Sequence, residues 1–277
     1  MCLIIFLIVL FIDSTYVLPN IISYSELFIR KVVPYLLFVF TISSMLIDYG
    51  LLEILPPTLY VIILSLISGF PSTSKYTVSL YKDNYLDKNT SKCLIRNCHY
   101  PNPLFLFGSV SCLISRNSCL RLFIVFIISS LIGLVIDENI SFKKFNYNSC
   151  DKSLNDSFSK AFKNSISTIL IIYGTSLFSY TIAFLLLKNI SVNSTLYCLI
   201  YGVFDLTKGI FSTSILLSKK IRELLILLFI SIGSISIHMQ VADILRDSDL
   251  KYSNFLIGRI RNTIICLMVY SLLDILY

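Results

Sequence analysis

Two hydrophobic segments in the first half of this chain are too short to cross a bilayer as helices. Thr58 to Ile67 and Leu104 to Ile114 each hold about half of the ~20 apolar residues that a transmembrane helix needs. Between them lie Ser68-Gly69-Phe70-Pro71 and Tyr100-Pro101-Asn102-Pro103. Irregular backbone persists at membrane depth only where it is buried in protein or lines a water-filled cavity. The sequence therefore predicts discontinuous or re-entrant helices around a polar path or pocket.

Composition places these segments in a membrane. The chain has 277 residues, of which 56% are hydrophobic and 14% are charged, whereas soluble domains carry about a quarter charged residues. We therefore expect an all-α polytopic integral membrane protein whose partner is the lipid bilayer. The net charge of +7 is spread through the loops, which is typical of positive-inside topology and contact with anionic lipid. Nucleic-acid binding is not expected, because no concentrated basic face with stacking aromatics occurs.

The remaining segments are a mixture of full and broken spans. Met1 to Phe11 begins either an uncleaved first span that ends near Leu18-Pro19 or a signal peptide, and the lack of a basic n-region favours the span. Ser72 to Cys98 predicts two amphipathic helices, the second capped by Asp87. We expect full spans at Val32–Leu52, Leu122–Ile136, Ile166–Leu187, Leu224–Ala242 and Phe255–Leu276, and broken pieces at Leu196–Phe204 and Ile210–Leu217.

A weak internal echo divides the chain into two similar halves. Ser25-Glu26-Leu27-Phe28 resembles Ser159-Lys160-Ala161-Phe162, and the two phenylalanines lie 134 positions apart. Chance similarity between apolar helices is the competing explanation. We predict one transmembrane domain over 1–277, with half-repeats at 1–136 and 166–277 and a polar divider loop at 137–165. Broken segments at corresponding positions of two halves indicate a transporter's binding site.

Charged and polar side chains inside apolar runs are the candidate site residues. Asp205 and Lys208 lie three apart between broken pieces, and charges at the bilayer centre are costly unless they face a cavity or each other. The alternative is a solvated turn at the interface. Ser236 and Gln240 share one helical face, and His238, off that face, titrates near neutral pH and is a candidate gate or proton relay. The alternative here is the wet end of a span.

Other candidates act through the backbone. Gly69, Pro71, Asn102 and Pro103 free N–H and C=O groups from helical bonding, so that half-helix ends can meet a ligand. Lys75, a turn beyond Pro71, either meets an anion there or reaches the headgroups.

Signatures of enzymes and metal sites are missing from the sequence. There is no Walker loop, no H-E-x-x-H, no G-x-S-x-G and no C-x-x-C pair among the eight cysteines. We therefore predict no catalytic residue, no metal and no cofactor.

Several of these residues also carry a family resemblance. Ser68 to Lys75 resembles the S-G-Y-P-x-G-A-K pattern of the sporulation integral membrane protein YlbJ family, in the nucleoside-recognition or Gate-domain group, and Asn102 to Val110 is similar to its N-P-L-F-x-x-G-[TS]-V. Gly233 to Val241 resembles the G-G-L-S-I-H-x-Q-V part of F-G-G-L-S-I-H-x-Q-V, with Ile232 in place of the phenylalanine. Asp205 to Gly209 is similar to E-[IL]-T-x-G, and Tyr252, Phe255 and Arg259 follow Y-x-x-F-x-x-x-R. Departures include Thr73 for the family glycine and Asp205 for its glutamate.

The resemblance implies a multi-pass protein of the bacterial cell membrane, in the forespore or mother cell, with a Gate-like fold and a link to endospore formation. We expect a transporter or permease of an unknown small solute; the alternative is a membrane scaffold that recruits spore-envelope assembly factors. The same chain could also associate with copies of itself as a homo-oligomer. The candidates for the substrate path are Gly69, Pro71, Ser72, Lys75, Asn102, Pro103, Asp205, Lys208, His238 and Gln240.

Overall fold

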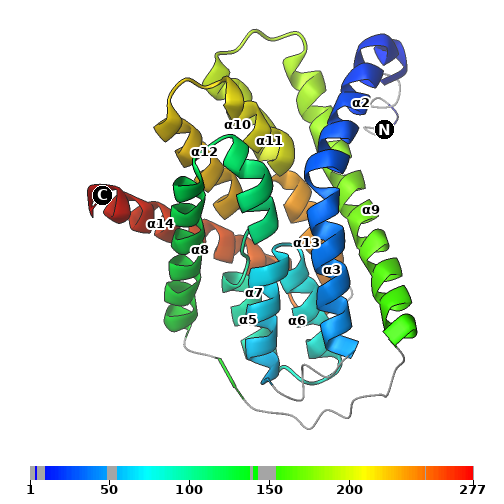
Figure 1. Ribbon diagram of the computed structural model, residues 1–277, viewed down its shortest axis with the longest axis vertical. Helices are drawn as coiled ribbons and strands as arrows, with labels where there is room; N and C mark the ends of the chain where they lie inside the picture. The colour runs from blue at the N-terminus through cyan, green and yellow to red at the C-terminus, as the bar shows by residue number, and fades with distance from the viewer. Residues whose placement is uncertain are drawn as a thin grey trace.

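Every regular element in the described part of the chain is a helix (Figure 1). The computed structural model describes residues 4, 10–48, 55–137, 140–142, 154–246 and 248–276. The first half contains α2 Ser14–Lys31, α3 Val33–Asp48, α5 Pro57–Ser68, α6 Ser72–Lys82, α7 Lys88–Asn97, the π-helical turn η1 Phe105–Ser109, the 3₁₀ turn η2 Val110–Cys112 and α8 Arg116–Asp137. The second contains α9 Leu154–Leu187, α10 Ser194–Phe204, α11 Leu206–Ser212, the 3₁₀ turn η3 Thr213–Ile215, α12 Lys219–Ile232, α13 Ile235–Arg246 and α14 Tyr252–Leu276.

Four helical stretches of the described chain are long and apolar enough to cross a membrane. They are α8, α9, α12 with α13, and α14; the pair α2 and α3, bent by 45°, would be a fifth. Helices α5 and α10 are apolar but shorter. The all-α class is thus confirmed for the described residues, which have the helices of a membrane-embedded protein.

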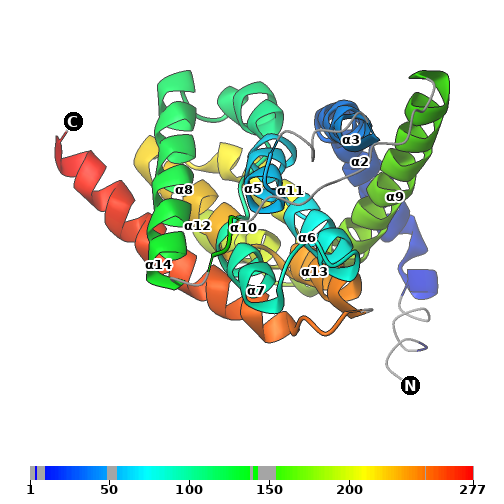
Figure 2. The same ribbon diagram turned by 90° about the horizontal axis from the view of Figure 1, so that it is seen from below.

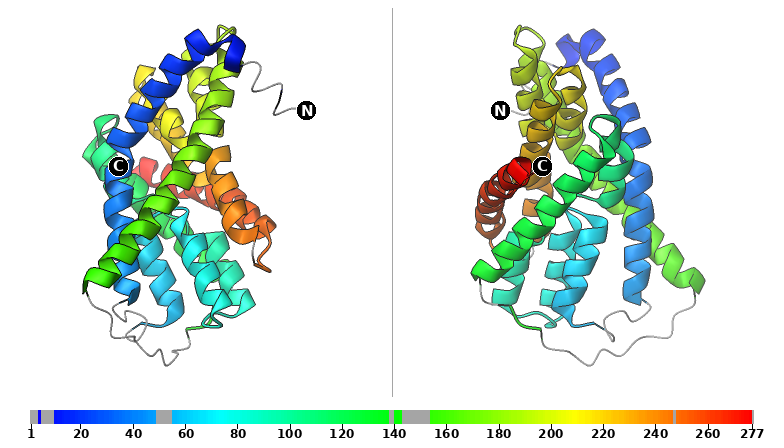
Figure 3. Two further views of the ribbon diagram at one scale, coloured as in Figure 1. Left: turned by 90° about the vertical axis from the view of Figure 1, so that its right-hand side faces the viewer. Right: turned by 60° about the vertical axis from the view of Figure 1, so that its left-hand side comes forward.

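The short helices, α5 to α7 and α10 to α13, lie between two walls of longer helices. Helices α8 and α14 form one side, and α2, α3 and α9 form the other (Figure 2). Helix α9 crosses the α2–α3 pair and packs against α3 (Figure 3). Helices α5, α6 and α7 gather at one end of the molecule, whereas α10, α11 and α12 gather at the opposite end (Figure 1).

Local chemistry explains where the short helices begin and end. Pro57 occupies the first position of α5, where its missing N–H costs least, and Gly69 ends that helix at φ +72°. The Asp87 carboxylate begins α7 as predicted, accepting backbone N–H bonds from Asn89 and Thr90 at 2.9 Å. Asn193 caps α10 in the same way.

Several expected segments differ from the structure. The span expected at Leu224–Ala242 lies within Lys219–Arg246, which is long and apolar enough to cross a membrane, but its helix is interrupted: Gly233 at φ +78° ends α12, and α13 begins two residues later. Helix α9 begins at Leu154, so residues 154–165 of the expected divider loop are helical. The rest of that loop lies mainly outside the described residues, as does most of Met1–Phe11. The expected end of the first span near Leu18-Pro19 is wrong, because α2 continues through Pro19 to Lys31.

Candidate functional site

The breaks in the helices of both halves meet at an internal cavity. This inner cavity has a volume of about 70 Å³. Its wall comes from α2, α3 and α9, and its floor from the segments around the helix breaks. The residues that line it are Phe28, Val32, Leu36, Phe70, Pro101, Asn102, Phe105, Ile172, Ser176, Leu206, Thr207, Ile230, Ser236, Ile237 and Gln240.

On the first-half side, Asn102 joins two breaks. Its Nδ2 donates to the Ser68 carbonyl at 3.2 Å, and its Oδ1 accepts the Phe105 N–H at 3.2 Å. The end of α5 and the start of the η1 segment are thereby held together. A Cβ on Gly69 would lie 2.6 Å from the main-chain nitrogen of Asn102, so only glycine lets the two backbone segments come this close.

On the second-half side, Asp205 has the corresponding role. It is fully buried, and its Oδ1 caps α11 by accepting the Lys208 N–H at 2.7 Å. Its Oδ2 accepts the Ser236 hydroxyl at 3.4 Å, which ties the α10–α11 break to the start of α13. The Tyr24 hydroxyl lies near this carboxylate and makes no regular hydrogen bond within the described residues. The buried Asp205 carboxylate therefore lies directly behind Ser236, which lines the inner cavity.

Lys208 and His238 stabilise the framework and do not line the cavity. The Lys208 ammonium lies over the rings of Tyr180 and Tyr201, at 5.9 and 5.4 Å from their centroids, a cation–π arrangement. His238 Nε2 lies 3.0 Å from the Ile232 carbonyl, and its Nδ1 lies 2.6 Å from the Tyr252 hydroxyl. Because a carbonyl only accepts, Nε2 carries the proton and Nδ1 accepts from Tyr252. His238 thus satisfies a carbonyl left free at the α12–α13 break.

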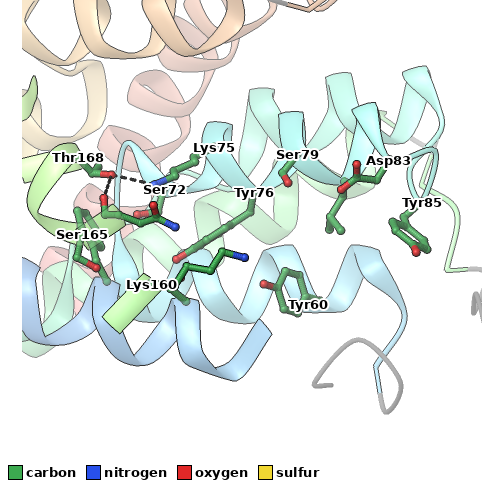
Figure 4. Close-up of a pocket in the computed structure, with 14 residues that line it drawn as sticks. Tyr60, Ser72, Lys75, Tyr76, Ser79, Asp83, Tyr85, Lys160, Ser165 and Thr168 are labelled. Atoms are coloured by element: carbon green, nitrogen blue, oxygen red, sulfur yellow. Dashed lines mark hydrogen bonds between the residues drawn. The ribbon is translucent and has the colours of Figure 1, made fainter. Parts of the chain in front are cut away.

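Two further cavities continue the inner cavity along α9. The middle cavity, of about 350 Å³, shares Ile172 and Gln240 with the inner one, and Pro71 also lines it. Gln240 is 3% exposed and donates from Nε2 to the Thr175 hydroxyl at 2.9 Å. The polar cavity, of about 250 Å³, shares Lys75, Asn164 and Thr168 with the middle one (Figure 4). The three cavities are consecutive and follow one face of α9.

The structure therefore brings together only part of the predicted site. Lining one or more of the three cavities are Pro71, Ser72, Lys75, Asn102 and Gln240. Gly69 and Asp205 are buried just behind the lining, whereas Pro103, Lys208 and His238 line none of these three cavities.

Sequence reasoning missed many lining residues, among them Ser176, Thr207, Lys160 and Thr168. Thr207 lies inside the Asp205–Gly209 motif, so the sequence contained a signal that could have identified it as a lining residue. The two α9 hydroxyls had none, because that helix carries many similar serines and threonines.

Two charged networks tie the helices together away from the cavities. Arg261 makes a bidentate contact to Asp137 at 2.8 and 2.7 Å, joining α14 to α8. Arg121 pairs with Glu223 and, at 3.2 Å, with Asp274, joining α8 to α12 and α14. Within the described residues, no group of three or more His, Cys, Asp or Glu side chains is arranged to hold a metal ion.

Comparison of the chain with protein families, curated proteins and solved structures finds no match in any of the three.

Proposed function

We propose that this protein is a membrane transporter that moves a small solute through the inner, middle and polar cavities. The observation that supports this most directly is the meeting of broken helices from both halves at the inner cavity. Unwound backbone and half-helix ends at such a point supply polar groups to a cargo. The first turns of α11 and α13, through Thr207 and Ser236, both border that cavity.

We also propose that the two halves are inverted repeats. Adding the 134-residue offset of the two phenylalanines to the bounds of α5 gives 191–202, which overlaps α10 at Ser194–Phe204. The same shift moves α7 to 222–231, inside α12, and moves α8 to 250–271, over most of α14. The α5–α7 and α10–α12 groups lie at opposite ends of the molecule, as an inverted repeat requires (Figure 1). Rocking of one group against the other would expose the inner cavity to each side in turn.

The biological setting comes from the resemblance to the YlbJ family. On that basis we propose that transport takes place in the bacterial cell membrane, in the forespore or mother cell, and supports endospore formation.

Metabolite profiling of sporulating cells tests this proposal. We expect a deletion strain to accumulate or lack a solute relative to wild type, and expression of the wild-type chain to reverse this. A Gln240→Leu variant removes a polar group from the inner and middle cavities, so it should insert normally and fail to reverse the change. The neighbouring Met239→Leu variant is the matched control, because Met239 is 38% exposed and lines none of the three cavities.

If Gln240→Leu restores both the metabolites and sporulation, the transport proposal is wrong. If a variant with reversed charges at Lys82, Lys88 and Lys92 then fails to support sporulation in the same strain, the scaffold is favoured. These lysines lie in α6 and α7 and line none of the three cavities.

A further inference from the structure

The polar cavity has a different character from the inner one. It lies between α5, α6 and α9, and side chains with hydroxyl and amino groups make up much of its lining. Lys75 and Thr168 lie side by side at one end, Lys160 and Tyr60 lie farther along, and Asp83 and Tyr85 occupy the opposite end (Figure 4). With two ammonium groups and one carboxylate, the described lining is net positive, and the carboxylate is at the far end from Lys75.

Lys75 is the lysine best placed to bind a ligand. Its Nζ donates to the Thr168 hydroxyl at 2.8 Å, and no carboxylate of the described residues lies within ion-pair distance of it. A neutral hydroxyl leaves the positive charge uncompensated, and an ammonium has three donors. Lys75 can therefore bind an anion while keeping or exchanging its bond to Thr168.

The surroundings of Lys75 add further donors. Helix α6 begins at Ser72, one turn before Lys75, so the positive end of the α6 dipole lies beside the cavity. Ser72 and Tyr76 line the same space, and the Tyr76 hydroxyl also lies 3.3 Å from the Ser68 hydroxyl. The volume of about 250 Å³ equals the share of roughly eight water molecules, which accommodates an oxyanion with a small organic group.

We propose that the polar cavity binds the oxyanion group, phosphate or phosphomonoester, of a small molecule through Lys75, with Lys160 adding positive charge farther along the lining. This rests on the proposed function and adds to it that the polar cavity is the entrance and that the cargo is anionic. Lys75, Asn164 and Thr168 also line the middle cavity, so an oxyanion at Lys75 lies at the junction between entrance and path.

Binding of inorganic phosphate and of glycerol phosphate to the purified full chain, in nanodiscs of zwitterionic lipid, tests this proposal. We expect saturable binding by calorimetry, weakened about tenfold or more in Lys75→Met, which loses a charge-assisted hydrogen bond, and weakened less in Lys160→Met, which loses a nearby positive charge. Lys75→Arg keeps the charge and should retain most of the affinity. Lys82→Met is the matched control, because Lys82 is exposed on the same helix and lines none of the three cavities.

A second arm separates a free solute from a lipid headgroup. If the oxyanion belongs to a lipid, phosphatidic acid in the nanodisc should compete with inorganic phosphate, and Lys75→Met should lose that competition. If it belongs to a soluble molecule, phosphatidic acid should leave phosphate binding unchanged.

Two results overturn the inference: no saturable binding of either phosphate probe by the folded wild-type chain, or equal binding by wild type and Lys75→Met. Because binding is measured without transport, the two proposals fail separately. Phosphate binding with an unchanged metabolite profile in the deletion strain would refute transport and leave the site in place. A changed metabolite profile without phosphate binding would refute the phosphate site and leave the transport proposal in place.

Discussion

Arg259 offers the sharpest test of how the broken helices are held. This α14 side chain is 1% exposed and donates to three main-chain carbonyls: Ser231 at 3.3 Å, and His99 and Arg96 at 3.5 Å. The Ser231 and Arg96 carbonyls lie in the last turns of α12 and α7. Within the described chain no carboxylate pairs with Arg259. We therefore infer that the guanidinium compensates the negative ends of two half-helices, one from each half.

Arg259→Met removes the charge and keeps a long apolar side chain. Each buried carbonyl left without a partner costs about 1–3 kcal/mol. The three bonds are long, which favours the lower figure and gives a total of about 3 kcal/mol for three carbonyls. Against this, the variant no longer buries an unpaired cation, and this offsets about 1 kcal/mol of the loss. We expect the loss to dominate, because two helix ends lose their common partner.

The assay is thermal unfolding of the purified chain in nanodiscs. A net loss of about 2 kcal/mol corresponds to a lowering of the midpoint by about 4–8 °C for a chain of this size. Arg246→Met is the matched control, because the Arg246 side chain is 77% exposed and makes only a surface pair at 3.4 Å with Asp243; its effect should stay within about 0.5 kcal/mol. An Arg259→Met midpoint equal to or above wild type would refute the compensation argument.

Three further predictions use the same measurement. Gly69→Ala should destabilise by about 3 kcal/mol or more, because φ is +72° and the added Cβ meets the Asn102 nitrogen at 2.6 Å; Gly174→Ala, with nothing within 4 Å, should stabilise by about 0.5–1 kcal/mol. Asp137→Asn should cost about 2 kcal/mol by weakening a bidentate arginine contact, and an unchanged midpoint would show that this network is dispensable. Burial raises the pKa of Asp87, but hydrogen bonds from the first turn of α7 outweigh this and hold the pKa below its ordinary value. The stability from Asp87 is therefore present above about pH 4 and lost as the pH falls through that lowered pKa. Asp87→Ala should cost about 1 kcal/mol at pH 7 and progressively less in acid, whereas a pH-independent cost would contradict the assignment.

The positions of the helix breaks could be predicted well, because breaking is a local property. Gly69 and the prolines of 101–103 interrupt apolar runs that are too short to span, and the structure interrupts the helices there. The break at Gly233 was not predicted, since a glycine within a long apolar run resembles many that helices tolerate. The start of α9 at Leu154 was not predicted, because the first turns of this helix are polar and resemble a loop. They are helical because they continue into a long apolar helix.

The amino-acid sequence by itself determined the helices, their caps and the excess of apolar surface, all of which depend on residues within a few positions of one another. Only the tertiary structure decided that Asn102 and Gln240, 138 positions apart, line one cavity, and that Lys208 and His238 turn away from it. It also decided that Arg259 meets the ends of α7 and α12. Periodicity and propensity specify which way a side chain faces on its own helix. What it faces depends on how distant helices pack, and that is set by the whole buried surface.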